Sequence, residues 1–180
     1  LSSLTEKIDA EVISKLSSSV KIISNFAVGF GNIDTIAAKK KNIIVTNTPD
    51  VLTDATAEIA MLVLLGAARR AKEGIEWANK KNWKWSADFL MGKQLSGARL
   101  GILGMGRIGR AVAQRARSFG MIIHYYNRSK LDKNLEQGAI YHNSLESLLS
   151  VSNFFSINCP ATKETKHIIN KDTLKNFPDG

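Results

Sequence analysis

Short apolar runs alternate with helix-like segments along the whole chain. The runs predicted to be strands are residues 20–24, 42–46, 100–103, 121–126 and 153–158, and the predicted helices are residues 33–40, 55–80, 107–119, 145–150 and 171–176. Strands separated by helices of this length are typical of a parallel sheet with crossover helices. The pattern therefore predicts an α/β fold with an open, doubly wound parallel sheet.

The longest of the predicted helices, residues 55–80, is apolar nearly all round in its first half. A helix with this pattern is expected to be buried on several sides. Polar residues at 53–58 supply candidates for its N-terminal cap. We expect this helix to join a small lobe, residues 1–46, to the larger remainder of the chain.

The strand at residues 100–103 runs directly into a glycine-rich segment, residues 104–109, with the sequence GMGRIG. A G-x-G-x-x-G string is weak evidence alone, but this one follows an apolar strand, opens an amphipathic helix and precedes a second strand. In such a unit Gly104 permits the tight turn, Gly106 leaves room for a pyrophosphate and Gly109 lets the helix pack closely on the strand. The helix N-terminus offers free N–H groups to the same anion. A Rossmann-type dinucleotide site is therefore predicted.

The end of the second strand, residues 125–130, bears on the choice between NAD and NADP. An NAD site usually places Asp or Glu about 20 residues after the glycines, to bind the ribose 2′-hydroxyl. Asn127 stands there instead, so no carboxylate would repel a 2′-phosphate. Arg128 offers a planar fork of donors for that phosphate, with Ser129 and Lys130 beside it. These residues predict a preference for NADP, with NAD as the alternative if Arg128 and Lys130 are only solvated charges.

Composition limits the class of protein. Of 180 residues, 44% are hydrophobic and 23% are charged, which is ordinary for a globular protein. The net charge of +9 has a nucleic-acid surface as one interpretation, but the basic residues are scattered, so no nucleic-acid partner is expected. The single cysteine, Cys159, excludes an internal disulfide, and the longest apolar run, residues 59–68, is about half of a membrane span. We expect a cytoplasmic protein with no membrane partner and no metal site.

Several separated segments together resemble one family, the D-isomer-specific 2-hydroxyacid dehydrogenases. They are residues 48–58 with the apolar helix and the arginine pair at 69–70, residues 95–109, and residues 158–167. The strand end at residues 127–129 is most similar to the glyoxylate and hydroxypyruvate reductase branch. The resemblance implies a Rossmann-type NAD(P)-binding domain over residues 48–180, incomplete at its C-terminus. It also implies part of a smaller, flavodoxin-like substrate domain over residues 1–47.

The resemblance also implies roles for single positions. Val28 and Gly29 match a loop that binds the substrate carboxylate through backbone N–H groups, although Gly31 stands where relatives often carry Asp. The positions implied to bind the cofactor are Leu52 and Thr56 near the nicotinamide, Gly104, Gly106, Arg107, Ile108 and Gly109 at the pyrophosphate, Asn127, Arg128 and Ser129 at the ribose, and Cys159, Pro160 and Thr165 over the adenosine.

Trp83 and Trp85 match a segment that reaches across a dimer interface in the family. The resemblance therefore implies a homodimer, in which Trp85 would help to line the partner's active site. Alternatively, the two tryptophan side chains only anchor an irregular segment to the hydrophobic core.

The family transfers a hydride between the nicotinamide and carbon 2 of a 2-keto acid, using an Arg, a His and a Glu. All three match motifs beyond residue 180, and residues 175–180 match the segment just before the Arg. His124, His142 and His167 match none of these positions. The resemblance implies no catalytic residue in this chain, which we expect to bind cofactor and to be inactive alone.

Two classes of function follow. The leading prediction is an NADP-preferring oxidoreductase that acts on glyoxylate, hydroxypyruvate or a related small 2-keto acid. Oxidation of D-lactate, phosphoglycerate, formate or phosphite remains open within that class. The alternative is a non-catalytic dinucleotide-sensing module of the co-repressor type, since relatives of that kind use the same fold.

Overall fold

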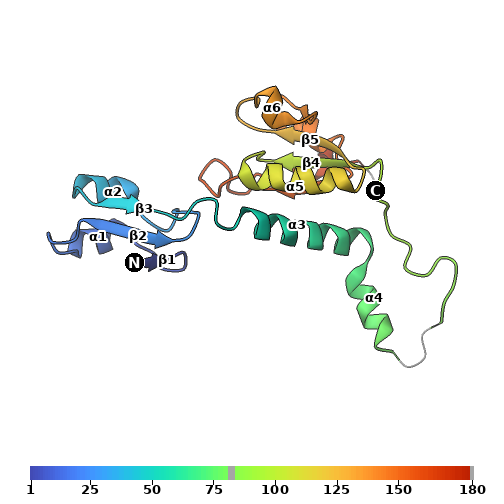
Figure 1. Ribbon diagram of the computed structural model, residues 1–180, viewed down its shortest axis with the longest axis horizontal. Helices are drawn as coiled ribbons and strands as arrows, with labels where there is room; N and C mark the ends of the chain where they lie inside the picture. The colour runs from blue at the N-terminus through green and yellow to red at the C-terminus, as the bar shows by residue number, and fades with distance from the viewer. Residues whose placement is uncertain (81–83, 179–180) are drawn as a thin grey trace. The chain divides into compact units, whose positions relative to one another are not determined.

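The computed structural model describes residues 1–80 and 84–178, which divide into two compact units (Figure 1). Unit 1 comprises Leu1–Leu52 and Pro160–Lys166, and unit 2 comprises Thr53–Cys159 and His167–Gly180. The sequence-based boundary between residues 47 and 48 lies shortly before the end of the first segment of unit 1. The sequence pattern did not predict that the short segment at residues 160–166 groups with unit 1.

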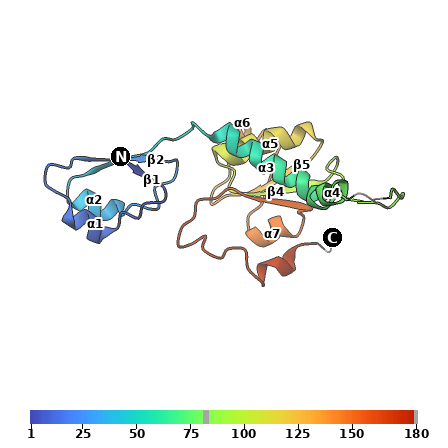
Figure 2. The same cartoon turned by 90° about the horizontal axis from the view of Figure 1, so that it is seen from below.

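Unit 1 is a three-stranded parallel sheet with two short helices. Its strands are β1 (Ser2–Ser3), β2 (Ile22–Phe26) and β3 (Ile44–Thr46), in the order β1-β2-β3, and its helices are α1 (Ala10–Lys15) and α2 (Thr35–Lys40). Asp9 and Asp34 begin the two helices, because each carboxylate accepts a backbone N–H of the first turn. Both helices lie on the same side of the strands (Figure 2). The core between them consists of Ile13, Ile23, Ile33, Ala38 and Ile43.

Unit 2 contains a four-stranded parallel sheet in the order β6-β5-β4-β7. The strands are β4 (Arg99–Leu103), β5 (Ile122–Tyr126), β6 (Ile140–Tyr141) and β7 (Phe154–Ile157), and the connections include α5 (Arg107–Ser118), α6 (Lys133–Glu136), α7 (Leu145–Leu149) and the 3₁₀ turn η1 (Thr173–Asn176). The chain proceeds from β4 outward to β6 and then crosses to the other side of β4 for β7. The strand order therefore reverses beside β4, where open α/β sheets bind their ligands.

Alternation along β4 explains how helices cover both faces of this sheet. Leu100 and Ile102 are fully buried in the cluster that includes the alanines of α5. Leu103 points the other way and packs with Leu145 and Leu149 of α7. Figure 2 shows α5 and α7 on opposite sides of the strands. The predicted doubly wound α/β sheet is confirmed.

The helix expected over residues 55–80 is in fact two helices, α3 (Thr53–Ala68) and α4 (Ala71–Ala78). The chain breaks at Arg70, whose φ of 53° is left-handed. The carbonyl of Ala68 accepts the Lys93 N–H at 2.8 Å instead of continuing the helical ladder, and Gly92 lies so close to that carbonyl that a Cβ would collide with it. A returning segment thus ends α3, which local periodicity could not reveal.

The expected burial of that helix on several sides is also wrong. Ala57, Met61 and Ala68 are buried, but Ile59, Leu62 and Val63 are each at least 60% exposed. The helix segment predicted at residues 171–176 is the shorter turn η1. The short elements β1, α1, α6 and β6 had not been predicted. None of the helices in the described ranges has the length and apolarity needed to cross a membrane.

Candidate functional site

The glycine-rich segment forms the turn from β4 into α5, as its spacing predicts. Gly104 has a φ of 92°, a left-handed value that side chains disfavour. A Cβ on Gly104 would stand 2.5 Å from the backbone nitrogen of Cys159, at the end of β7. Only glycine therefore allows the turn to lie so close to the chain at the end of the neighbouring strand β7.

The other two glycines differ in what surrounds them. A Cβ on Gly109 would collide with the carbonyl oxygen of Gly104, so this glycine lets α5 pack onto the turn. A Cβ on Gly106 would meet nothing within 4 Å. Gly106 is also the N-cap of α5 and has no side-chain capping bond. This arrangement suits a pyrophosphate, which needs close backbone approach and N–H donors.

The ends of β4, β5 and β7 are tied together around this turn. The Gly104 N–H donates to the Tyr126 carbonyl at 3.0 Å, and the Asn158 N–H donates to the Leu103 carbonyl at 2.8 Å. The Asn127 side-chain oxygen accepts the Met105 N–H at 2.7 Å. Because a backbone N–H can only donate, the amide oxygen of Asn127 faces the turn and its NH₂ group is directed elsewhere.

Residues 128–130 follow Asn127 and are exposed. The Lys130 ammonium lies 3.8 Å from the Glu136 carboxylate, which is 8% exposed. Glu136 also accepts the Tyr125 hydroxyl at 2.6 Å, and burial together with that carboxylate raises the pKa of Tyr125 to about 12. This partner of Lys130 was missed because α6 was not predicted, and it leaves Arg128 as the more available cation.

The predicted cofactor residues fall into both units. Unit 2 contains Thr56 in α3, the three glycines with Arg107 and Ile108 at the start of α5, Asn127, Arg128 and Ser129 after β5, and the half-buried Cys159 after β7. Burial raises the pKa of the Cys159 thiol, because the side chain packs against the cluster that contains Leu103. Unit 1 contains Leu52, Pro160 and Thr165, and the Thr165 hydroxyl donates to the Pro160 carbonyl at 2.6 Å.

The loop predicted to hold a carboxylate lies in unit 1, directly after β2. Val28 is half-buried and Gly29 is exposed. Trp85 is 76% exposed, whereas Trp83 lies outside the described residues.

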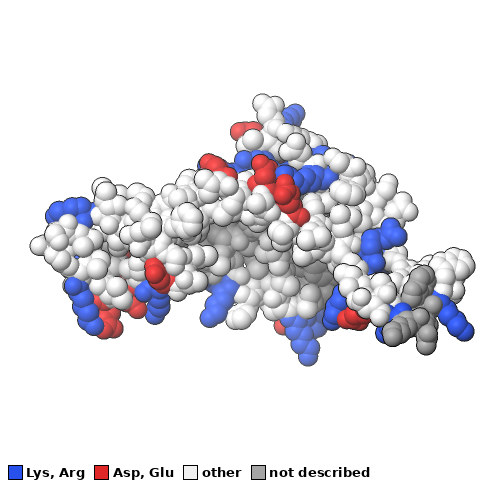
Figure 3. All heavy atoms as spheres, turned by 60° about the horizontal axis from the view of Figure 1, so that its bottom comes forward, with Lys and Arg blue, Asp and Glu red and all other residues white. Residues whose placement is uncertain are grey.

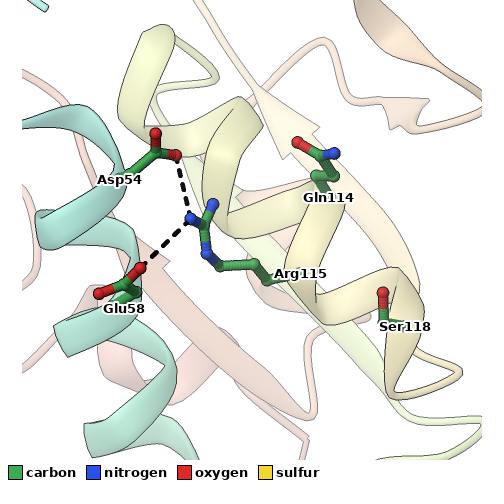
Figure 4. A pocket seen from close by; sticks show the side chains of 5 residues that line it. All are labelled: Asp54, Glu58, Gln114, Arg115 and Ser118. Atoms are coloured by element: carbon green, nitrogen blue, oxygen red, sulfur yellow. Dashed lines mark hydrogen bonds and ion pairs between the residues drawn. The ribbon is translucent and has the colours of Figure 1, made fainter.

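A groove of about 470 Å³ lies between α3 and α5 (Figure 4). Arg115 reaches from α5 to Asp54 at 3.0 Å and to Glu58 at 3.8 Å, both on α3. Because these three charged side chains pair with one another, we interpret them as ion pairs that link α3 to α5 and not as a ligand site. Over the face shown in Figure 3, Lys and Arg side chains are interspersed with Asp and Glu.

A pair of histidines was also missed by the sequence. His124 Nδ1 lies 2.9 Å from His142 Nε2, and His142 Nδ1 lies 3.2 Å from the Ser147 hydroxyl. Burial lowers the pKa of both imidazoles, and their mutual proximity adds to this for His124. The pair depends on β6, which sets His142 beside β5. Within residues 1–80 and 84–178, no cluster of three or more His, Cys, Asp or Glu is arranged to hold a metal.

The chain is similar to proteins of one family. The family model "D-isomer specific 2-hydroxyacid dehydrogenase, NAD binding domain" matches residues 61–180. The glycerate dehydrogenase of Hyphomicrobium methylovorum is 45% identical, over 100% of this chain and 57% of that protein. The glyoxylate reductase of Thermococcus kodakarensis is 46% identical, over 96% of this chain and 53% of that protein.

A solved structure adds the same similarity in three dimensions. The D-lactate dehydrogenase of Aquifex aeolicus, complexed with NAD and lactic acid, has a TM-score of 0.91 at 33% identity, covering 99% of this chain and 53% of that one. The chain therefore spans about half the length of the relatives that it matches. The predicted family and the predicted Rossmann-type fold are confirmed.

Proposed function

The chain belongs to the D-isomer specific 2-hydroxyacid dehydrogenase family, and from this we propose that it is the cofactor-binding part of an NADP-preferring reductase of a small 2-keto acid. When bound, the nicotinamide supplies the hydride. The residues of this chain bind and orient the dinucleotide. The catalytic Arg, His and Glu that the family resemblance implies match no residue here, so we expect the 180 residues alone to bind cofactor without turnover.

The observation that carries the proposal is the turn at Gly104, Gly106 and Gly109. Two of these glycines are required by packing, since a Cβ would collide with backbone, whereas the space beside Gly106 is open. Gly106 leaves that space free beside the N-terminus of α5. A pyrophosphate next to the α5 N–H groups explains all three positions.

The preference for NADP is supported by Asn127 and Arg128. The Asn127 oxygen is already used by the Met105 N–H, so the remaining amide hydrogens offer donors rather than an acceptor for a ribose 2′-hydroxyl. The adjacent Arg128 is exposed and carries a charge complementary to a phosphate. NAD is the alternative cofactor, and the relative from Aquifex aeolicus was solved with NAD.

Glyoxylate and hydroxypyruvate are the substrates that we propose. The first support is the glyoxylate reductase among the relatives. The second is the glycerate dehydrogenase, because oxidation of glycerate at carbon 2 gives hydroxypyruvate. Val28 and Gly29 are proposed to bind the substrate carboxylate.

We also propose that the protein is a homodimer through α3. Ile59, Leu62 and Val63 expose their apolar side chains on one helix, and exposed apolar groups of this kind favour association with a second surface. A second copy of the chain is the simplest partner, because a symmetric contact would cover the same face on both copies.

The full-length protein tests the proposed function directly. NADPH oxidation should be followed at 340 nm with glyoxylate, hydroxypyruvate and pyruvate as separate substrates. Rapid oxidation with the first two supports the proposal, and rapid oxidation only with pyruvate would move it to a lactate dehydrogenase. Tight cofactor binding without any turnover would favour the dinucleotide-sensing alternative.

A further inference from the structure

Three successive carbonyl groups in the loop after β2 are each held by a donor from elsewhere in unit 1. The Ala27 carbonyl accepts the Thr48 N–H at 2.9 Å. The Val28 carbonyl accepts the Asn47 side-chain amide at 2.8 Å. The Gly29 carbonyl accepts the Asn25 side-chain amide, also at 2.8 Å. Because all three carbonyls are held, the backbone at residues 27–29 has a defined orientation.

Asn25 is the most deeply buried of these donors. Its side chain is 1% exposed, accepts the Ser2 hydroxyl at 3.0 Å and lies 3.2 Å from the Asn32 amide oxygen. Asn32 in turn donates to the carbonyls of Ser3 and Glu6 at 3.0 Å. This network joins the loop to β1 and fixes the direction in which the Asn25 amide points.

Asn47 follows β3 and is a second side chain that holds the loop. Its amide donates to the Val28 carbonyl, while the next residue, Thr48, donates its backbone N–H to Ala27. Because Asn47 is half-buried, its side chain can be changed with less damage to the core than that of Asn25.

The held carbonyls determine where the loop's N–H groups point. A trans peptide is planar, so each N–H is directed opposite to the preceding carbonyl. The Val28 N–H therefore points away from Thr48, and the Gly29 N–H points away from Asn47, so both groups are directed away from the same short segment. Within the described part of the chain, the N–H groups of Val28, Gly29 and Phe30 donate no hydrogen bond to the protein. Adjacent N–H groups directed outward together form a binding surface for an anion.

We infer that Asn25 and Asn47 are positioning residues for substrate, which hold the 27–29 backbone so that the N–H groups of Val28 and Gly29 receive the carboxylate of the 2-keto acid. The inference rests on the proposed function, since it assumes that this loop binds the substrate. It adds two side chains that do not touch the substrate but fix the direction of the donors that do. Preorganised donors bind an anion more tightly because they need no ordering on binding.

The test compares Asn47→Ala with Thr46→Val in the full-length protein. Thr46 is adjacent, and its hydroxyl donates to Ser24 at 3.2 Å without reaching the loop. We expect Asn47→Ala to raise the KM for glyoxylate about tenfold, the effect of losing one hydrogen bond, with kcat changed less than about twofold. NADPH affinity, measured by tryptophan quenching, should match wild type in both variants. Asn25→Ala should raise KM in the same direction but can also impair folding.

Two results would overturn the inference, and they can be told apart from failure of the proposed function. An unchanged KM in Asn47→Ala, with an active wild-type protein, removes the positioning role and leaves the reductase intact. A rise in KM accompanied by parallel losses of kcat, NADPH affinity and Tm assigns Asn47 a purely structural role. A wild-type protein that reduces neither glyoxylate nor hydroxypyruvate removes the proposed function and, with it, the basis of the inference.

Discussion

The side-chain oxygen of Asn127 accepts the backbone N–H of Met105 at 2.7 Å, which joins the end of β5 to the glycine-rich turn. The two residues lie far apart in sequence, and each belongs to a different part of the proposed dinucleotide site. The hydrogen bond makes Asn127 a support for the turn, in addition to the contact with the ribose that we propose for it. Substitutions at this position therefore separate support of the turn from choice of cofactor.

Asn127→Asp should reverse the cofactor preference. A carboxylate keeps an oxygen for the Met105 N–H, but its second oxygen accepts a ribose hydroxyl and repels a 2′-phosphate. We expect NADPH affinity to fall about tenfold or more and NADH affinity to rise. Fluorescence titration measures both. Asn127→Ala is the control, because it removes the support and should weaken both cofactors alike; equal loss in the Asp variant would contradict the assignment.

Gly106 and Gly109 should respond differently to the same added methyl group. In Gly109→Ala the Cβ meets the Gly104 carbonyl, and overpacking of this kind costs about 1–3 kcal/mol, visible as a lower Tm. In Gly106→Ala the Cβ enters open space, so Tm should hold while dinucleotide affinity falls. A Gly106→Ala protein that binds cofactor like wild type would show that no pyrophosphate approaches this position.

The His124–His142 pair should make the protein less stable in weak acid. The folded state lowers both pKa values below 6.5, so the unfolded chain takes up protons first as the pH falls. The stability is therefore complete above pH 6.5 and decreases below it, towards the folded pKa values. Thermal melts at pH 7.5 and 5.5 should show a larger loss of Tm for wild type than for His142→Gln. Parallel losses would mean that other groups dominate in this range.

Leu62→Lys should convert the proposed dimer to a monomer. The ammonium group cannot be buried without a partner, and Leu62 is 63% exposed in the single chain, so the monomer should still fold. Leu174→Lys is the matched control, since Leu174 is 55% exposed on η1, away from α3 in the sequence. Sedimentation of the full-length protein gives the mass; a wild-type monomer, or an unchanged dimer in the Leu62 variant, would exclude this interface.

Much of unit 2 could be predicted because its signals are local. The strand before Gly104, the glycine spacing and the amphipathic pattern of α5 lie within twenty consecutive residues, and Asn127 follows at a family-typical distance. What the sequence could not supply are contacts made by short or distant elements. The break at Arg70 depends on Lys93, and the pairing of Lys130 with Glu136 depends on the short helix α6. The amide contacts of Asn25 and Asn47 are likewise tertiary.

The most direct test of the central claim is a titration of the protein with NADPH and with NADH, followed by quenching of tryptophan fluorescence. The account predicts tight NADPH binding, weaker NADH binding, and loss of the difference in Arg128→Ala. Lys130→Ala should have a smaller effect, because that ammonium lies beside Glu136. Equal binding of the two cofactors would contradict the NADP preference, and binding of neither would contradict the dinucleotide site itself.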